Sequence, residues 1–193
     1  MASDPGFARF VSLACHDLRT PLATVSGFAH TLDRLEDLSE PADRYVGMII
    51  AATEQLTELL DELGLVTRIE RGRYEPALVE VDTLELVNVA AGLVGEQADA
   101  EGTGATVRVD REPTERAVAA LARCALRHGA LDQVHVRADG TDVLVSPVTP
   151  AAAPIVLAEE LKDLGAATAR RVVEAFGGSL SLEGEVLRVR LPD

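Results

Sequence analysis

The sequence predicts an α+β protein, in which a helical hairpin that forms a dimeric four-helix bundle is followed by an α/β sandwich. Two observations support this fold class. Residues 11–63 contain two runs in which apolar residues recur three and four positions apart, the spacing of a helical seam. Residues 77–193 combine helical spacing with short stretches of strict alternation, typical of strands that turn one apolar face to a layer of helices.

The two helical runs are separated by a polar stretch from Glu36 to Asp43, in which Ser39 is a predicted N-cap and Pro41 an early-helix residue. Pro21 lies inside the first run, where it removes one backbone hydrogen bond and predicts a kink. The two runs together predict an antiparallel hairpin. Its seam residues are Val11, Ala14, Leu18, Pro21, Val25, Phe28, Leu32 and Leu35 in the first run, and Val46, Ile49, Thr53, Leu56, Leu60 and Leu63 in the second.

The apolar stripe of this hairpin is wider than two helices can cover, because positions that flank the seam are also apolar. Burial of one large apolar side chain stabilises a fold by roughly 1.5 to 3 kcal/mol, whereas net stability is only about 5 to 15 kcal/mol. We therefore predict that two copies pair as a homodimer. The flanking residues are Cys15, Leu22 and Ala29 in the first run and Ile50, Ala52 and Leu59 in the second.

The helical pattern ends at Arg71, Gly72, Arg73 and Pro76, which predicts a first domain over 1–72 and a second over 77–193. We expect the helices of the second domain to cover one face of a mixed sheet. Its predicted elements are a helix over 83–97, a strand around Val107 and Val109, a helix over 114–127, strands over 134–138 and 143–145 joined by an Asp139-Gly140 turn, a helix over 155–176 ended by Gly177-Gly178, and a hairpin over 180–191.

The composition excludes several classes of function. The formal net charge of −14 repels phosphate backbones and anionic lipids, so neither nucleic acid nor membrane is an expected partner. Cys15 and Cys124 are isolated, without the spacing of a disulfide framework, and no cysteine or histidine shows a metal-ligand spacing. Because no apolar run has the length of a membrane span and no signal peptide is present, we expect a cytoplasmic protein.

His16 is the residue best placed for chemistry. Counted along the heptad it falls outside the seam, with Thr20 one turn further along the same face. An exposed neutral imidazole offers a ring nitrogen as nucleophile. The neighbouring carboxylate of Asp17 is suited to accept the other ring N–H and to stabilise the cation that forms during attack.

The segment His16-Asp17-Leu18-Arg19-Thr20-Pro21-Leu22 resembles the phosphoacceptor box of bacterial sensor histidine kinases. This resemblance implies that His16 carries the phosphoryl group and that Asp17 orients it. It also implies that Arg19 contacts phosphate or a partner and that Thr20 aligns water for dephosphorylation. Residues 68–72, Val81-Asp82, Leu164-Gly165 and 170–178 resemble parts of the ATP-binding domain of the same family.

The nucleotide motifs of that family are missing from the second domain. Cys124 stands where the family has a magnesium-binding Asn, and a thiol is a poor ligand for Mg²⁺. Residues 146–152 replace the Asp-x-Gly-x-Gly motif, and Asp163 stands where a glycine near phosphate is expected. The resemblance therefore implies a degenerate ATPase domain that holds no cofactor and no metal.

These features favour a histidine phosphotransfer protein of a two-component phosphorelay. Phosphate would be exchanged between His16 and the aspartate of a response-regulator receiver domain, which would bring its own Mg²⁺. Whether the chain is an enzyme stays open. If it is one, we expect a phosphotransferase that acts through phosphohistidine, and ATP-dependent autokinase activity is disfavoured. The alternatives are an ATP-dependent sensor histidine kinase with an atypical nucleotide site and a non-catalytic pseudokinase scaffold.

Overall fold

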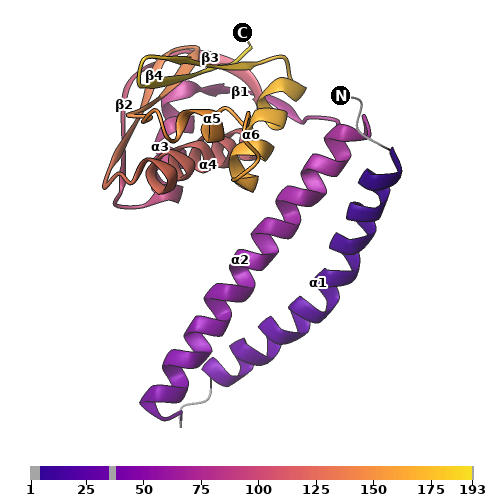
Figure 1. Cartoon of the computed structure of the whole chain (residues 1–193). Helices are drawn as coiled ribbons and strands as arrows, with labels where there is room; N and C mark the ends of the chain where they lie inside the picture. Colours follow the sequence, from indigo (N-terminus) through magenta and orange to yellow (C-terminus); the bar gives the residue numbers. More distant parts are fainter. Residues whose placement is uncertain (1–4, 35–37, 193) are drawn as a thin grey trace. The chain divides into compact units, whose positions relative to one another are not determined.

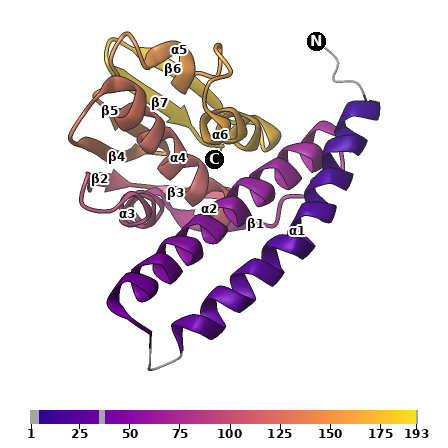
Figure 2. The same ribbon diagram turned by 60° about the horizontal axis from the view of Figure 1, so that its bottom comes forward.

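The computed structural model describes residues 5–34 and 38–192 and divides the chain into two compact units, Met1–Arg73 and Tyr74–Asp193. In the first unit, helices α1 (Pro5–Asp33) and α2 (Glu40–Glu70) lie side by side as a hairpin (Figures 1 and 2). The predicted helical hairpin is thus confirmed. Leu35 and Glu36, which the sequence analysis placed at the end of the first run and the start of the polar stretch, lie outside the described residues.

Local sequence signals set the ends of α2. The backbone carbonyl of Ser39 accepts hydrogen bonds from the N–H groups of Ala42 and Asp43 at 2.8 and 3.0 Å, while its side chain makes no cap bond. At the other end Gly72 adopts a φ of +61°, and the N–H of Arg73 donates to the carbonyl of Arg68 at 2.9 Å. This is the left-handed glycine stop that ends many helices.

The helices of the hairpin pack through one narrow row of small side chains. Thr53 is 4% exposed, and its hydroxyl donates to the Ile50 carbonyl of its own helix at 2.8 Å. The other buried residues of this row among the described positions are Cys15 and Ala29 on α1 and Val46, Leu60 and Thr67 on α2, each less than 9% exposed.

The apolar residues of α1 therefore lie on two faces, one buried against α2 and one exposed. Leu18, Val25 and Leu32, assigned to the seam, are 42–54% exposed, whereas Cys15 and Ala29, assigned to its flank, are 3% exposed. The physical reason is that the heptad pattern records every apolar position and does not distinguish burial within the hairpin from an apolar surface left uncovered. α1 continues through Pro21, so this proline does not break the helix.

The second unit contains a five-stranded mixed sheet in the order β2-β4-β5-β7-β6, and a separate antiparallel pair of β1 with β3. β2 runs parallel to β4, and the remaining neighbours in the larger sheet are antiparallel. The elements are β1 (Leu78–Asp82), α3 (Thr83–Val94), β2 (Ala98–Gly104), β3 (Thr106–Asp110), α4 (Arg111–Gly129), β4 (Val134–Gly140), β5 (Asp142–Ser146), α5 (Ala153–Val156), α6 (Leu164–Ala175), β6 (Ser179–Glu183) and β7 (Val186–Arg190).

The helices α3, α4 and α6 cover one face of the larger sheet, as predicted (Figure 2). Its strands send alternating valines and leucines into this layer, and Leu121 of α4 meets them with no exposed surface. The sandwich is therefore held by aliphatic burial, which suits a chain with only 3% aromatic residues. The fully buried strand residues include Val134, Val136, Val143, Val145, Leu187 and Val189.

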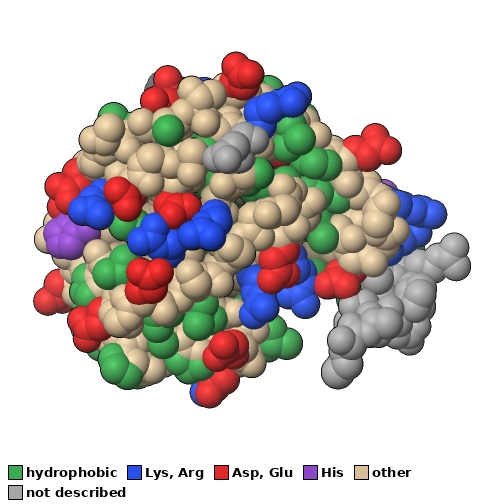
Figure 3. Space-filling model, turned by 90° about the horizontal axis from the view of Figure 1, so that it is seen from above, with side chains coloured by type: hydrophobic (Ala, Val, Ile, Leu, Met, Phe, Trp, Pro, Cys, Tyr) green, Lys and Arg blue, Asp and Glu red, His purple; other side chains and the backbone are tan. Residues whose placement is uncertain are grey.

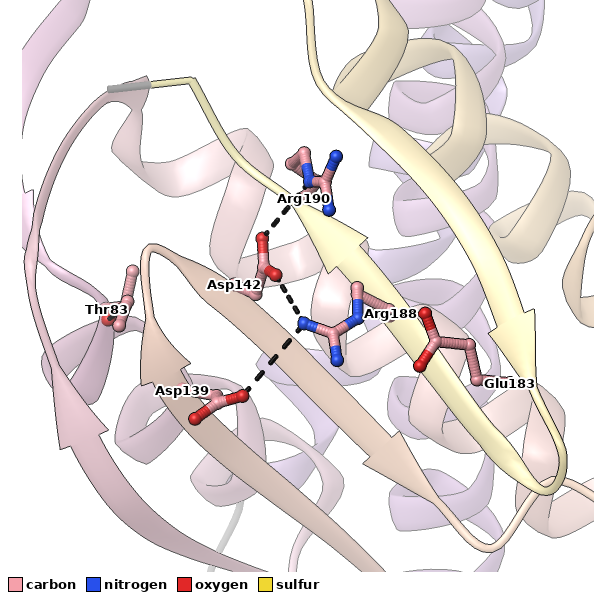
Figure 4. A network of polar contacts seen from close by, with 7 residues as sticks. Thr83, Asp139, Asp142, Glu183, Arg188 and Arg190 are labelled. Carbon is pink, nitrogen blue, oxygen red and sulfur yellow. Dashed lines mark hydrogen bonds and ion pairs between the residues drawn. The ribbon is translucent and has the colours of Figure 1, made fainter.

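A charged network lies on the outer face of this sheet (Figure 4). Arg188 Nη1 donates to Asp142 Oδ2 at 2.6 Å, and Arg188 Nε lies 3.6 Å from Glu183 Oε1. Arg190 Nε lies 3.7 Å from Asp142 Oδ1. Arg188 is also the cross-strand partner of Leu144, which is 6% exposed, because an arginine stem covers apolar surface while its guanidinium meets water and carboxylates.

The sequence-based boundaries were wrong at four places, one of which is the predicted Asp139-Gly140 turn: Asp139 pairs with Asp142, so the turn lies at Gly140-Thr141. β1 and β2 were not predicted. In β2 only the two small alanines Ala98 and Ala100 alternate with polar residues, and Gly-Thr-Gly follows, which is a weak strand signal. Gly95, with a φ of +94°, ends α3 at Val94 rather than at 97. The predicted helix over 155–176 is divided into α5 and α6, since Ala158 adopts a positive φ of 52° and residues 157–163 leave the helical path.

Figure 3 shows a face of the molecule on which Lys and Arg side chains lie close to Asp and Glu side chains. Ion pairs within the α/β unit join Arg116 to Glu112 at 2.9 Å and Lys162 to Glu160 at 2.6 Å. Among the described residues, no helix combines the length and apolarity needed to cross a bilayer. The exclusion of nucleic acid and membrane as partners stays a prediction.

Replacement of Leu121 by Ala is expected to lower the free energy of unfolding of the α/β unit by about 2 to 5 kcal/mol, because it leaves a cavity in the core. Leu93→Ala is the matched control, since Leu93 is 44% exposed and its loss is expected to cost less than about 0.5 kcal/mol. Urea unfolding followed by circular dichroism measures both variants. Equal losses would contradict the assignment of the core.

Candidate functional site

The first candidate site is the surface of α1 around His16. His16, Asp17 and Thr20 are all exposed in the chain. His16 and Thr20 are one helical turn apart and share a face, whereas the structure shows no hydrogen bond between the His16 ring and the Asp17 carboxylate. The role of Asp17 as orienting base therefore stays a prediction.

The periodicity of α1 separates this face from the apolar stripe. Each residue advances a helix by about 100°, so His16 and Leu18 point about 160° apart. Thr20 and Leu18 are separated by the same angle. A partner that covers Leu18, Val25 and the rest of the stripe therefore leaves the imidazole accessible.

Arg19 has a partner within the hairpin. Its Nη2 lies 2.8 Å from Asp61 Oδ1 and 3.5 Å from the Leu60 carbonyl on α2. Both side chains of the ion pair are nearly half exposed, at 45% and 47%. An exposed pair of this kind contributes only about 0.2 to 1 kcal/mol, so Arg19 can exchange Asp61 for another anion at little cost. Its predicted contact with phosphate or a partner stays a prediction.

The second candidate site lies in the α/β unit, where α4 meets the start of α6. Cys124 of α4 is completely buried. Burial and the nearby Asp163 carboxylate raise the pKa of its thiol from the usual 9.0 to about 12. The thiol is therefore protonated near neutral pH, and this position offers no oxygen ligand of the kind that Mg²⁺ requires.

Asp163 is committed to contacts within the protein. Its Oδ1 accepts a hydrogen bond from the N–H of Ala166 at 3.0 Å and so caps α6. Its Oδ2 accepts from Arg127 Nη1 at 3.0 Å and lies 3.3 Å from His128 Nε2. Asp163 stands where the resemblance led us to expect a glycine near phosphate, and protein donors surround its carboxylate.

Apolar side chains of the segment between β5 and α6 pack inward. Val148, Ala152, Ile155 and Val156 are at most 6% exposed, and α5 packs against α4. Gly165 allows α6 to approach α4, since a Cβ there would lie 3.1 Å from the Ala120 Cβ. Its role is close packing.

Gly177 and Gly178 end α6, as predicted. Gly177 has a φ of +88°, and a Cβ on Gly178 would lie 2.6 Å from the Arg190 carbonyl oxygen.

A cluster of possible metal ligands lies where α4 meets the start of α6. Cys124, His128 and Asp163 each bring one possible ligand atom to within 4.8 Å of the others, whereas the expected absence of a metal stays a prediction. The spacing of four residues between Cys124 and His128 places both on one face of α4, and this signal was available in the sequence. The approach of Asp163, the residue that precedes α6, could not be predicted from the sequence.

Comparisons with known proteins agree with this architecture. Residues 8–72 match the His Kinase A (phospho-acceptor) domain. The probable sensor histidine kinase TcrY of Mycobacterium tuberculosis is 35% identical over 72 residues, which cover 37% of this chain and 15% of TcrY. The sensor protein CutS of Streptomyces coelicolor is 31% identical over 222 residues, which cover 95% of this chain and 52% of CutS.

The chain is therefore similar to proteins named sensor histidine kinases and sensor proteins. It spans about half of the length of CutS and a smaller part of TcrY. The crystal structure of full-length ShkA in complex with AMPPNP matches 94% of this chain and 44% of that chain with a TM-score of 0.68 and 21% identity, a similarity of fold. The second unit thus has the fold of the histidine-kinase ATPase domain.

These relatives correct the functional interpretation of the sequence. The prediction of a histidine phosphotransfer protein rested on the missing nucleotide motifs, but the match to CutS, a sensor protein, extends over nearly the whole chain. Loss of motif residues changes a local site without changing the ancestry that the remaining sequence records. The assignment to the histidine phosphotransferase type is therefore wrong, and the sensor histidine kinase alternative is favoured.

The pKa of Cys124 gives a test of the packing around α4. Because the folded state raises this pKa from 9.0 to about 12, it holds the thiol proton more tightly than the unfolded chain does. The stability that depends on this proton is fully present below pH 9 and is lost as pH rises from 9 towards 12.

We expect the unfolding free energy of the wild-type protein to fall more steeply above pH 9 than that of Cys124→Ala. Denaturant titrations at a series of pH values provide the measurement, and Cys15→Ala is the control for general alkaline effects. Parallel pH profiles of wild type and Cys124→Ala would show that Cys124 titrates normally.

Proposed function

We propose that the chain is the core of a two-component sensor histidine kinase, with His16 as its phosphoacceptor and an atypical nucleotide site in the α/β unit. The observation that carries this proposal is the exposed imidazole of His16 on the free face of a helix within the matched phospho-acceptor domain. The relatives named as sensor histidine kinases and the retained ATPase-like fold support it.

In this proposal a ring nitrogen of His16 attacks the γ-phosphorus of ATP, a nitrogen–phosphorus bond forms, and ADP leaves. The phosphoryl group then passes from His16 to an aspartate of a response-regulator receiver domain, the proposed partner. Asp17 stabilises the imidazolium that develops, and Thr20, on the face of His16, aligns water for dephosphorylation. Arg19 leaves Asp61 to meet the incoming phosphate or the receiver, which its weak surface ion pair permits.

Mg²⁺ does not fit the family position in the α/β unit. The residue at that position is a buried, protonated thiol, and the nearest carboxylate, Asp163, is bound by Arg127 and His128. Magnesium favours octahedral oxygen ligands and retains several waters, whereas this position offers a buried sulfur. The proposed nucleotide site is atypical because this position offers no oxygen ligand for Mg²⁺.

A second candidate function is a non-catalytic pseudokinase scaffold that docks on a receiver or on a true kinase. The observation that favours it is that the apolar residues of the segment between β5 and α6 are buried against the rest of the α/β unit. In this case the hairpin would supply a docking surface without carrying phosphate.

Incubation with magnesium and ATP labelled at the γ-phosphate distinguishes the two candidates. We expect wild-type protein to acquire acid-labile, base-stable phosphate, and we expect His16→Gln to acquire none. His30→Gln is the matched control, because His30 is another exposed histidine on α1 and its loss should leave labelling unchanged.

Calorimetry with ATP accompanies the labelling experiment. Binding together with His16-dependent labelling supports the kinase. If neither ATP binding nor labelling is found, and His16→Gln still captures a receiver domain, the scaffold hypothesis is supported. Labelling of His16→Gln to the wild-type level would remove His16 as the phosphoacceptor.

We also propose that two hairpins pair through the exposed apolar stripe as a homodimeric four-helix bundle. One hairpin leaves Phe28 68%, Leu56 50% and Ile49 43% exposed, and such a continuous stripe is costly in water. Pairing through this stripe leaves the opposite face of α1, with His16 and Thr20, open to a receiver. The geometry of the helix therefore makes dimerisation and phosphotransfer compatible.

Replacement of Leu56 by Glu is expected to convert the dimer into monomer, since a buried unpaired carboxylate opposes association. Ala51→Glu is the control, because Ala51 is exposed on α2 about 140° from the direction of Leu56. Sedimentation equilibrium measures the molecular mass of each variant. A wild-type chain that sediments as a monomer would contradict the proposal directly.

A further inference from the structure

We propose that Cys124, His128 and Asp163 form a binding site for a zinc-type divalent cation between α4 and the start of α6. The three ligand atoms all lie within 4.8 Å of one another. This site does not depend on the proposed function, and it holds whether or not His16 is phosphorylated.

The protein frame holds these side chains in place. Cys124 and His128 are four residues apart on α4 and therefore share one face, and Asp163 approaches from the residue that precedes α6. α4 and α6 pack against each other, with the close approach at Gly165 and Ala120. The site is thus built from one face of α4 and the residue that caps α6, and the packing of these two helices favours fixed ligand geometry.

The distance between two of the ligands already suits zinc. His128 Nε2 and Asp163 Oδ2 lie 3.3 Å apart. Two such ligands at about 2.0 to 2.1 Å from one tetrahedral Zn²⁺ are separated by roughly 3.3 to 3.4 Å. A zinc-bound sulfur lies roughly 3.5 to 3.6 Å from the other ligands, so the thiol of Cys124 has at most about 1.3 Å to close.

The chemistry of the ligands selects the cation. One sulfur, one imidazole nitrogen and one carboxylate oxygen match Zn²⁺ and exclude Mg²⁺, which requires oxygen. The Ala166 N–H holds Asp163 Oδ1 at 3.0 Å and so orients Oδ2 towards His128, as hydrogen bonds behind metal ligands commonly do. Three protein ligands leave the fourth tetrahedral position to water or to an added anion.

Arg127 competes with a cation for the Asp163 carboxylate but does not block it. Its side chain is 65% exposed, so the guanidinium can turn into solvent when a divalent charge replaces it. Cys124 releases its thiol proton to solvent as the metal–sulfur bond forms. The cation would then link α4 to α6 through three bonds in place of two hydrogen bonds.

The test is a metal titration of the untagged full chain after treatment with a chelator and gel filtration. We expect one Zn²⁺ per chain, an increase in melting temperature on binding, and no competition from Mg²⁺. With Co²⁺ as a spectroscopic probe, we expect a thiolate-to-cobalt charge-transfer band, which reports the sulfur ligand directly.

The variants Cys124→Ser and His128→Gln are each expected to lower zinc affinity by a factor of about ten or more. Cys15→Ser and His135→Gln are the matched controls, since each removes the same type of side chain elsewhere and should leave affinity unchanged. Because His128 is partly exposed, its variant tests the site even if Cys124→Ser fails to fold.

Absence of one-to-one zinc binding would overturn the proposal. Unchanged affinity in both Cys124→Ser and His128→Gln, or a cobalt complex that lacks the thiolate band, would overturn it equally.

Discussion

The periodicity of the α-helix is the constraint on which the organisation of the hairpin depends. With about 100° per residue, α1 has to distribute its side chains over three directions. Cys15 and Ala29 face α2, Leu18 and Val25 form the uncovered apolar stripe, and His16 is directed away from both. Because these directions are fixed by spacing alone, the residue available for chemistry and the surface available for association are kept apart.

The α/β unit depends on a different interaction, the burial of aliphatic side chains between the larger sheet and the layer of α3, α4 and α6. This burial does not require the residues that contact a nucleotide. A histidine-kinase ATPase-like scaffold can therefore retain its fold while Cys124 occupies a ligand position and Asp163 is bound by protein donors. Family membership and site chemistry are separate questions here, and each has to be argued from its own residues.

Sequence patterns predicted the elements whose stability is recorded in side-chain periodicity. The two long helices, the glycine stops at Gly72 and Gly177, and the strands with alternating valines belong to this group. β2 could not be predicted, because its stability comes from backbone pairing with β4 and not from its own side chains. The sequence also singled out His16 and Cys124 as candidate residues, and the role of His16 stays a prediction. The approach of Asp163 to His128 depends on how two helices pack, which no local spacing records.

The small side chains between α1 and α2 have a mechanical consequence. Thr53 and Thr67 satisfy their hydroxyls within their own helix, and the other described residues of the buried row are an alanine, a cysteine and aliphatic residues. These side chains therefore provide no polar bond from one helix to the other. Sliding or rotation of one helix against the other therefore loses only weak dispersion contacts at this row. The surface ion pair of Arg19 with Asp61 opposes such movement. Arg19 is about one helical turn from His16, whose imidazole the movement would displace.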